Sequence, residues 1–251
     1  MSFSILGVRP RLMPTLLVGL GFLILLGLGT WQVERLAWKT QLLDTIASRM
    51  SAPPRTLTAA NLNAVADYER VRVDGQFLHD RELHMLARSL TADEIGYQVL
   101  TPFRVTGGGT VIVNRGFVPS DRRDPETRPE GQVQGTVSVT GIARFPQAPG
   151  LRWLIPDNRP TDNVWIWPDL QRMAATVGIG PVAPFVIEAD ATPNPGGLPV
   201  GGQTRLNIPN DHLQYAITWY ALAVALVIMF IVAHRRPRRK DADPAVRERK
   251  R

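Results

Sequence analysis

The chain has 251 residues, of which 44% are hydrophobic and 20% are charged, and its formal net charge is +7. This length allows one ordinary domain or two small ones. The sequence contains no cysteine, which excludes disulfides, thiolate zinc sites, iron–sulfur clusters, a cysteine nucleophile and haem attachment through a CxxCH motif.

The first predicted element is a transmembrane helix over residues 12–33. These residues lie between Arg11 and Glu34 and carry no charge, and a helix needs about 20 apolar residues to span a bilayer core. Residues 1–11 would form a short N-terminal segment. A cleaved signal peptide is the alternative, but its apolar region is usually only about 7–15 residues long. We therefore expect a retained anchor.

The helix is expected to continue out of the membrane to about Met50. Trp31, Arg35 and Trp38 recur at helical spacing, and a Ser-Ala-Pro-Pro stop follows at residues 51–54.

Residues 34–211 are predicted to form the main domain. Val71 and Val73 alternate with charged residues before Gly75, which is typical of a half-buried strand that ends in a turn. Similar patterns predict strands at 96–105, 110–118, 133–145 and 185–189, and a short helix at 168–178. The sequence thus predicts an α+β membrane protein, in which two transmembrane helices flank a mainly antiparallel β domain, either a curled sheet or an open barrel.

Three features of this domain are interpreted as surface structure. Residues 121–131, rich in Arg, Asp and Pro, predict an exposed polar loop, and the Pro/Gly-rich residues 192–202 predict a spacer. His79 and His84 lie five positions apart, so neither a strand nor a helix places them on one face. We expect both to be exposed and to share no metal.

The last predicted elements are a second transmembrane helix over residues 212–234 and a basic tail over 235–251. Residues 34–211 have a net charge of −1, whereas the tail has a net charge of +6. Basic residues that follow a span favour the cytoplasmic side, so both termini are expected in the cytoplasm and the main domain outside. Because the excess charge flanks the spans, it indicates contact with anionic membrane lipid rather than with nucleic acid.

Polar and aromatic residues gather where the two spans are expected to meet the outer surface. His212, Tyr215 and Trp219 share a helix face at offsets of three and seven. Two interpretations remain open: an aromatic belt with a polar helix cap, or a pocket for a flat apolar macrocycle whose iron binds His212 and whose acidic groups pair with Arg35. The corresponding residues are Trp31, Gln32, Arg35 and Trp38 on the first helix, and His212, Gln214, Tyr215 and Trp219 on the second.

No sequence motif indicates catalysis. The chain lacks GxSxG, HExxH and P-loop motifs, and no GxGxxG follows a predicted strand. We therefore expect a protein that is not an enzyme.

Six segments of the chain are informative when taken together: GTWQVERLAWK (29–39), YERVRVDGQF (68–77), GYQVLTPFRV (96–105), VIVNRGFVP (111–119), DNVWIWPDLQRMA (162–174) and NDHLQYAITWYALA (210–223). In this order they resemble the surfeit-locus-protein-1 family of cytochrome c oxidase assembly factors. Phe117 stands where this family usually has Trp.

The resemblance implies a factor that binds haem a and aids its delivery to oxidase subunit I, after receiving it from haem a synthase. His212 would ligate the haem iron, and Trp31, Arg35, Tyr215 and Trp219 would line the pocket. The alternative is a cofactor-free scaffold whose β domain holds subunit I or haem a synthase.

In that scaffold, Arg115, Trp165 and Trp167 would be contact or structural residues, with Arg115 in a buried ion pair. The short segment before the first span leaves no room for a mitochondrial transit peptide. We therefore expect a multi-pass protein of a bacterial inner membrane, with a periplasmic domain.

Overall fold

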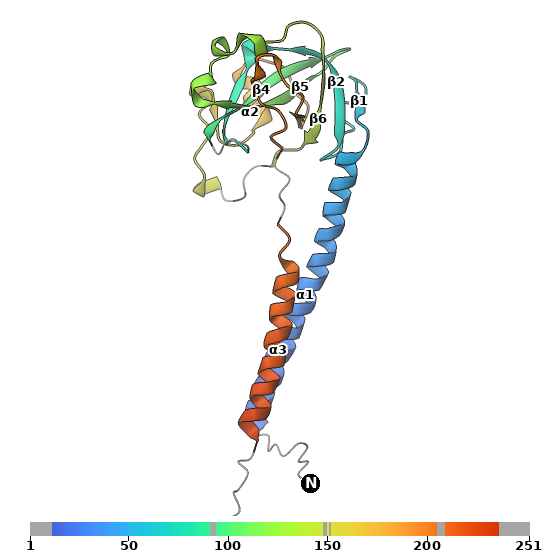
Figure 1. Cartoon of the computed structure of the whole chain (residues 1–251), viewed down its shortest axis with the longest axis vertical. Coiled ribbons are helices and arrows are strands. Elements are labelled where there is room, and N and C mark those ends of the chain that lie inside the picture. Colours follow the sequence, from blue (N-terminus) through green and yellow to red (C-terminus); the bar gives the residue numbers. More distant parts are fainter. Residues whose placement is uncertain (1–11, 91–93, 148–149, 151, 205–208, 236–251) are drawn as a thin grey trace, which may run out of the picture. The chain divides into compact units, whose positions relative to one another are not determined.

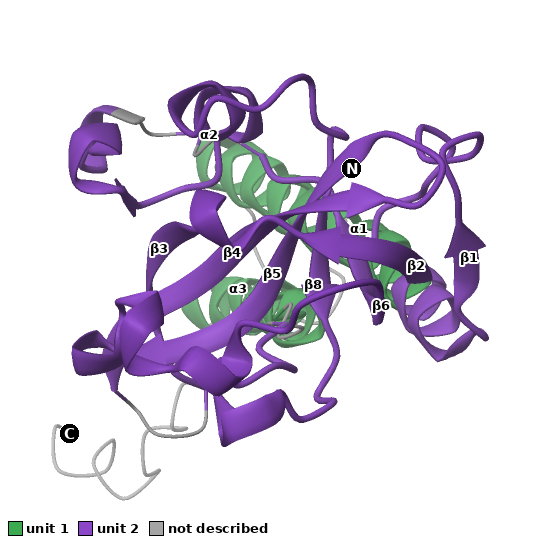
Figure 2. Cartoon of the chain, turned by 90° about the horizontal axis from the view of Figure 1, so that it is seen from above, with its two compact units in different colours: residues 1–43, 208–251 green, residues 44–207 purple. Residues whose placement is uncertain are grey.

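The computed structural model describes residues 12–90, 94–147, 150, 152–204 and 209–235 (Figure 1). The predicted N-terminal segment and nearly all of the basic tail lie outside these residues. The chain divides into two compact units, one formed by residues 1–43 with 208–251 and the other by residues 44–207, which are coloured separately in Figure 2. Each unit is described by itself.

The first unit is made of two long apolar helices. It contains helix α3 (His212–His234) and most of helix α1 (Leu12–Ser51), whose last residues, from Asp44 on, belong to the second unit. Both are long and apolar enough to cross a membrane, as judged by length and composition. The predicted pair of apolar helices is therefore confirmed, and α1 continues without a break through the predicted extension. Their membrane orientation stays a prediction.

Small residues allow α1 and α3 to approach closely. A Cβ atom on Gly29 would lie 2.7 Å from Cε1 of Tyr220, and Ala216 and Ala223 of α3 are buried. The hydroxyl groups of Thr30 and Tyr220 lie 3.2 Å apart. Helices in membranes commonly pack through small residues and interhelical hydrogen bonds in this way.

The second unit is built on one sheet with short helices around it. The shortest of the described strands are β7, with two residues, and β1, with three. The strands are β1 (Arg55–Leu57), β2 (Arg70–Phe77), β3 (Leu83–Arg88), β4 (Ile95–Val105), β5 (Thr110–Pro119), β6 (Val137–Arg144), β7 (Val164–Trp165) and β8 (Val186–Ala189). The helices are α2 (Leu170–Thr176) and the 3-10 turns η1 (His79–Arg81), η2 (Ser120–Arg122), η3 (Pro125–Thr127), η4 (Pro129–Gly131), η5 (Arg152–Leu154), η6 (Pro160–Asp162) and η7 (Pro195–Gly197).

The sheet closes on itself. Its strand order is β1-β2-β6-β8-β5-β4-β3-β7, and an additional pairing of β2 with β4 joins β2, β6, β8, β5 and β4 into a ring. The curvature of these strands is visible in Figure 2. Most pairings are antiparallel, whereas β1–β2, β3–β7 and β5–β8 are parallel. The predicted mainly antiparallel, barrel-like domain is therefore confirmed, with a mixed sheet.

Alternation along the strands produces the core of the ring. Val71 and Val73, predicted from their alternation with charged residues, are fully buried and pack with Phe103 of β4 and Ile187 of β8. A second cluster joins Leu83, Trp165 and Met173, so that α2 packs against β3 and β7. The Asp169 side chain accepts a hydrogen bond from the backbone N–H of Arg172 at 3.2 Å and thereby caps α2.

The Pro/Gly-rich segment is not a free spacer. The backbone N–H groups of Phe117 and Val200 donate to each other's carbonyl oxygens at 2.9 and 2.8 Å, which joins residues 192–202 to β5. The prediction of a simple spacer was wrong because backbone pairing does not depend on side-chain pattern.

The prediction that His84 is exposed was also wrong, because His84 is 5% exposed. The predicted exposed loop is confirmed for most of residues 121–131, but Arg128 within it is 3% exposed. Both side chains belong to one buried network, described below, in which Glu82 is the polar partner of each.

Candidate functional site

One candidate site lies where α3 begins beside α1. His212 is the first residue of α3, and Gln32 of α1 is buried. His212 Nδ1 lies 2.7 Å from Gln32 Oε1. An amide oxygen can only accept a hydrogen bond, so Nδ1 carries the proton. In the neutral imidazole, Nε2 then keeps its lone pair and can bind a metal.

Among the predicted residues of α1, Arg35 is in contact with both Trp31 and Trp38. The guanidinium carbon of Arg35 lies 5.8 Å from the ring centre of Trp31 and 5.1 Å from that of Trp38. Spacings of four and three residues place the two indoles on either side of one cation. Both tryptophans are about half exposed, so this cation remains accessible.

The predicted residues of α3 are placed differently from one another. Tyr215 is exposed and Trp219 is half-buried, while Tyr220, which the sequence analysis did not select, is the aromatic residue that contacts α1. Within the described residues, no hydrogen bond or ring contact links Arg35 with His212. The structure thus joins His212 to Gln32 and Arg35 to two tryptophans, as two separate groups.

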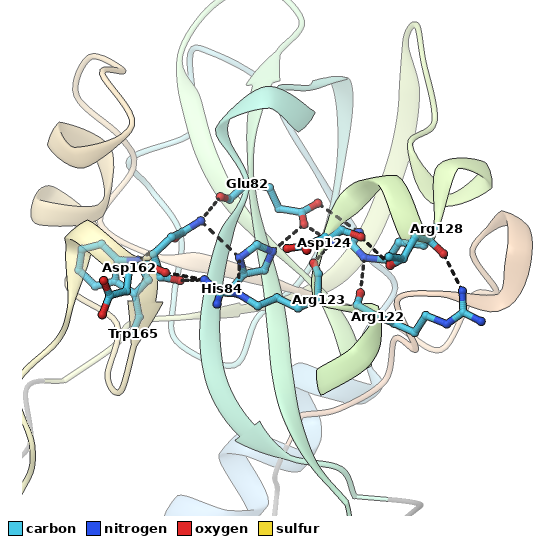
Figure 3. Close-up of polar contacts among 10 residues, drawn as sticks. Glu82, His84, Arg122, Arg123, Asp124, Arg128, Asp162 and Trp165 are labelled. Atoms are coloured by element: carbon cyan, nitrogen blue, oxygen red, sulfur yellow. Dashed lines mark hydrogen bonds and ion pairs between the residues drawn. The ribbon is translucent and has the colours of Figure 1, made fainter.

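A second candidate site is a buried polar network in the β domain (Figure 3). Glu82 Oε1 accepts from His84 Nε2 at 3.0 Å and from Arg128 Nη2, and Glu82 Oε2 accepts from Arg128 Nη1 at 3.3 Å. The side chains of Glu82 and Arg128 are each 2% exposed. Burial would raise the pKa of Glu82, but the bonds from His84 and Arg128 outweigh this effect and hold it below its ordinary value.

The other ring nitrogen of His84 faces a second set of donors. His84 Nδ1 lies 3.3 Å from Asn163 Nδ2 and 3.4 Å from Arg123 Nε, and it accepts from both. Asn163 adopts a left-handed backbone conformation with φ 50°, and its Oδ1 accepts from Trp165 Nε1 at 3.3 Å. Figure 3 shows His84 beside Glu82 and Arg123.

This network is a structural device. Every polar atom of Glu82 and of the His84 ring is engaged, so neither group is available to a substrate. The network instead ties β3 to the loop containing Arg123 and Arg128 and to β7. Sequence analysis missed it, although one signal was present: Glu82 and His84 are two residues apart, which places them on one face of a strand.

The three residues expected to contact partners or support the fold differ in burial. Arg115 is 1% exposed and Trp165 is fully buried, whereas Trp167 is half-buried. Trp165 belongs to the core that contains α2. The backbone N–H of Trp167 donates to Asn158 Oδ1 at 3.2 Å. The expected ion pair of Arg115 is absent: in the described part of the chain no carboxylate reaches its guanidinium.

A cavity of about 340 Å³ is lined by Asn114 of β5 and by Glu188 of β8. Asp67 and Arg144 in the same wall pair at 3.2 Å. Burial raises the pKa of Glu188 above its ordinary value, and a hydrogen bond with Thr204 offsets part of this rise. Among the described residues there is no group of three or more His, Asp or Glu side chains that could hold a metal ion.

These features define a class of protein: a closed β domain attached to two apolar helices, with a histidine at the start of the second helix whose Nε2 has no hydrogen-bond partner among the described residues. Comparison with known proteins identifies the family. The family model described as "SURF1 family" matches residues 20–224.

Named relatives agree with this match. The chain is 41% identical to a SURF1-like protein of Monosiga brevicollis over 222 residues, which cover 84% of this chain and 83% of the relative. It is 39% identical to Surfeit locus protein 1 of Xenopus tropicalis over 81% of this chain and 70% of the relative. It is also 39% identical to Surfeit locus protein 1 of Homo sapiens, over 79% of this chain and 70% of the relative. The chain therefore belongs to the SURF1 family, and the resemblance seen in the sequence is confirmed.

Proposed function

We propose that this protein is an assembly factor for a haem-copper cytochrome c oxidase, which binds haem a and aids its delivery to subunit I. The family is known for oxidase assembly. The observation that carries the haem proposal is the bond between His212 Nδ1 and Gln32 Oε1, because it leaves Nε2 as the nitrogen that can bind iron.

The residues present fit a haem as cargo. Haem supplies an iron that accepts an axial imidazole and two propionates that accept charge-assisted hydrogen bonds. His212 Nε2 would bind the iron. Arg35 is accessible between Trp31 and Trp38 and would pair with a propionate, while Tyr215 and Trp219 would offer apolar surface to the macrocycle.

The cargo would enter and leave without any change in its covalent bonds, so the protein would act as a chaperone and not as an enzyme. The partners would be haem a synthase as donor and oxidase subunit I as acceptor. The proposed location is a bacterial inner membrane. The charge distribution supports only the orientation of the chain in it, with both termini in the cytoplasm and the β domain in the periplasm.

The test is an optical spectrum of the full-length protein, purified in detergent from cells that make haem a. We expect a haem a spectrum that is lost or shifted in His212→Ala. His234→Ala is the matched control, because His234 is also a histidine of α3 but lies at the opposite end of that helix. Its Nδ1 lies 2.9 Å from the Phe230 carbonyl oxygen. A spectrum that is unchanged in His212→Ala would contradict this residue as ligand.

A cofactor-free scaffold is the alternative outcome of the same experiment. If the native protein is colourless while haem a is present in the same membranes, haem binding is contradicted. The protein would then stabilise subunit I or haem a synthase by contact, and co-purification of either protein with both the native chain and His212→Ala would be the expected result.

A further inference from the structure

Arg115 is a buried positive charge that forms no ion pair with any carboxylate of the described residues. It is 1% exposed, and its Nη2 donates to the Gly131 carbonyl at 2.5 Å and to Asn194 Oδ1 at 3.2 Å. Both acceptors are neutral. The ring centre of Phe77 lies 4.7 Å from the guanidinium carbon. Burial lowers the pKa of Arg115 to about 10. The charge of Glu82 offsets only part of this effect. Because burial of a charge without a direct ion pair is costly, the position of Arg115 requires an explanation.

The backbone places Arg115 by a β-bulge. In the pairing of β5 with β4, Gly116 faces Val99 and Asn114 faces Leu100, so Arg115 is the additional residue. Asn114 Oδ1 accepts from the Gly116 N–H at 3.1 Å, and Gly116 has φ 120°. A bulge redirects one side chain away from the ladder. The Asn-Arg-Gly sequence therefore builds the position of this arginine.

Other polar atoms beside Arg115 also lack protein partners. Its own Nε and Nη1 make no hydrogen bond, and neither do the amide oxygen and nitrogen of Gln132 or Nδ1 of His79. His79 Nε2 lies 2.9 Å from the Val133 carbonyl, so these atoms gather around residues 131–133. Buried polar groups are usually paired with protein or with ordered water, so these atoms have hydrogen-bonding capacity that a polar ligand could use.

A cavity adjoins this group. Its volume is about 410 Å³, and Arg115, Phe77 and Asn194 contribute to its wall together with the apolar side chains of Val137 and Ala189. This volume lies in the range of small-molecule sites. The cavity thus combines a cationic end with an apolar wall.

Its charges limit the ligand further. Arg72 also lines the cavity and donates from Nε to Ser138 Oγ at 2.7 Å, but Arg72 is exposed to solvent, so Arg115 is the buried cation of this wall. Asp190 lines the cavity as well and would repel a second negative charge. The apolar wall disfavours a fully hydrated ion. A single negative charge on an apolar body fits these conditions.

We propose that this cavity binds a carboxylate carried by a small apolar body. Arg115 Nε or Nη1 would donate to the carboxylate, while Nη2 keeps its bonds to Gly131 and Asn194, and Val137 and Ala189 would contact the apolar part. This site uses none of the residues assigned to haem, so the two proposals stand separately.

The experiment measures butanoate binding to the full-length protein in lipid nanodiscs by isothermal titration calorimetry, with butanamide as the neutral analogue. We expect butanoate to bind and butanamide not to bind. Arg115→Met is expected to weaken it about ten-fold or more, since charged hydrogen bonds are the stronger ones. Arg172→Met is the control, because Arg172 is an exposed residue of α2 outside the cavity. His212→Ala should leave butanoate binding unchanged whether or not haem binding is lost.

A second variant keeps the proposal testable if Arg115→Met does not fold. Thr192 lines the cavity and is exposed, so Thr192→Trp should obstruct the cavity without disturbing the core, and it should also weaken butanoate about ten-fold. The proposal is overturned by an absence of saturable binding, by equal binding of butanamide, or by unchanged affinity in Thr192→Trp.

The same assay distinguishes two sources of the carboxylate. The tripeptide Ala-Val-Ala with a free C-terminal carboxylate is compared with its C-terminal amide. Binding of the free peptide tighter than that of butanoate, with loss in the amide, would indicate a protein terminus as ligand. Weaker binding of the peptide than of butanoate would indicate a small organic acid.

Discussion

Gln32 and His212 join the two apolar helices through a hydrogen bond of 2.7 Å between Gln32 Oε1 and His212 Nδ1. In α1 this bond lies about one turn from Gly29, where α1 meets Tyr220 of α3. Close packing of the helices and the orientation of the imidazole are therefore coupled. A change that separates the helices would also move His212 Nε2, the nitrogen proposed to bind iron.

The first prediction concerns Gln32→Leu, which removes the acceptor of the His212 proton. Partners that orient a metal-binding histidine commonly contribute about 10- to 100-fold in affinity, so we expect haem affinity to fall by this order while some colour remains. Haem titration followed by absorbance measures the change. Gln32→Glu retains an acceptor and should restore most of the affinity. Gln214→Leu, at an exposed position of α3, should leave it unchanged, and a loss there equal to that of Gln32→Leu would argue against the role of Gln32.

The second prediction concerns Gly29→Val. A Cβ atom at Gly29 would lie 2.7 Å from the Tyr220 ring, whereas a Cβ atom at Gly27 would have no atom within 4 Å. Valine at position 29 should therefore weaken the pairing of α1 with α3 by about 1–3 kcal/mol, and valine at position 27 should not. Titration with sodium dodecyl sulfate, followed by circular dichroism, compares the two midpoints. Equal midpoints would mean that the helices do not pack at Gly29.

The sequence predicted those parts of the fold that depend on local periodicity. Two uninterrupted apolar stretches predicted α1 and α3, and alternation around Val71 and Val73 predicted β2 and its buried face. Closure of the ring could not be predicted, because it depends on β2 pairing with β4 as well as with β6. Register between distant strands leaves no periodic signal within either strand.

The buried polar groups were harder to predict for a related reason. His84 and Arg128 look like surface residues when each is considered by itself, since isolated charges are rarely buried. They are buried because Glu82 contacts both, and Glu82 and Arg128 are 46 positions apart. For His212 the sequence indicated a residue that could bind metal, but it could not pair that residue with Gln32, which is 180 positions away.

The third prediction tests this buried network with Glu82→Gln. The change keeps the side-chain shape but leaves the charge of Arg128 without its counter-ion in a buried site. Removal of one partner from a buried pair typically costs about 3–5 kcal/mol, so the free energy of unfolding should fall by this amount. Urea unfolding followed by near-ultraviolet circular dichroism, to which buried Trp165 contributes, measures it. Asp80→Asn, at an exposed carboxylate, should change stability by less than about 0.5 kcal/mol.

The fourth prediction is a pH dependence caused by Glu188. Burial raises its pKa in the folded protein above the ordinary value of 4.5. At a pH between the pKa of Glu188 in the unfolded chain and its higher pKa in the folded protein, the unfolded chain has lost the Glu188 proton while the folded protein retains it. The free energy of unfolding therefore decreases as the pH rises through this window. Glu188→Gln cannot ionise and should therefore raise the melting temperature at pH 7.

The difference between Glu188→Gln and the native protein should shrink as the pH falls toward 4.5, because both side chains are then neutral. Melting curves from pH 4 to pH 8 would show this convergence. Glu126→Gln is the control at an exposed position and should produce no gain at pH 7. A Glu188→Gln protein that is less stable than the native one at pH 7 would show that ionised Glu188 is stabilised in the fold.

The fifth prediction concerns Gly116, the residue that follows Arg115 in the bulge. Gly116 has φ 120°, and a Cβ atom there would lie 2.0 Å from the Val200 carbonyl oxygen. Gly116→Ala must therefore strain the backbone and displace residues 192–202 from β5. Gly135 also has a positive φ, 80°, but a Cβ atom there would have no atom within 4 Å.

Comparison of Gly116→Ala with Gly135→Ala separates the clash from backbone strain. Strain at positive φ costs about 1–2 kcal/mol, and this should be the whole effect at position 135. Position 116 should lose several kcal/mol more and expose residues 192–202 to proteolysis, since backbone atoms cannot move aside as a side chain can. Partial digestion followed by mass spectrometry would locate the cut. Because Asn194 is bonded to Arg115, cleavage in this segment of Gly116→Ala but not of Gly135→Ala would show that the bulge holds the segment in place.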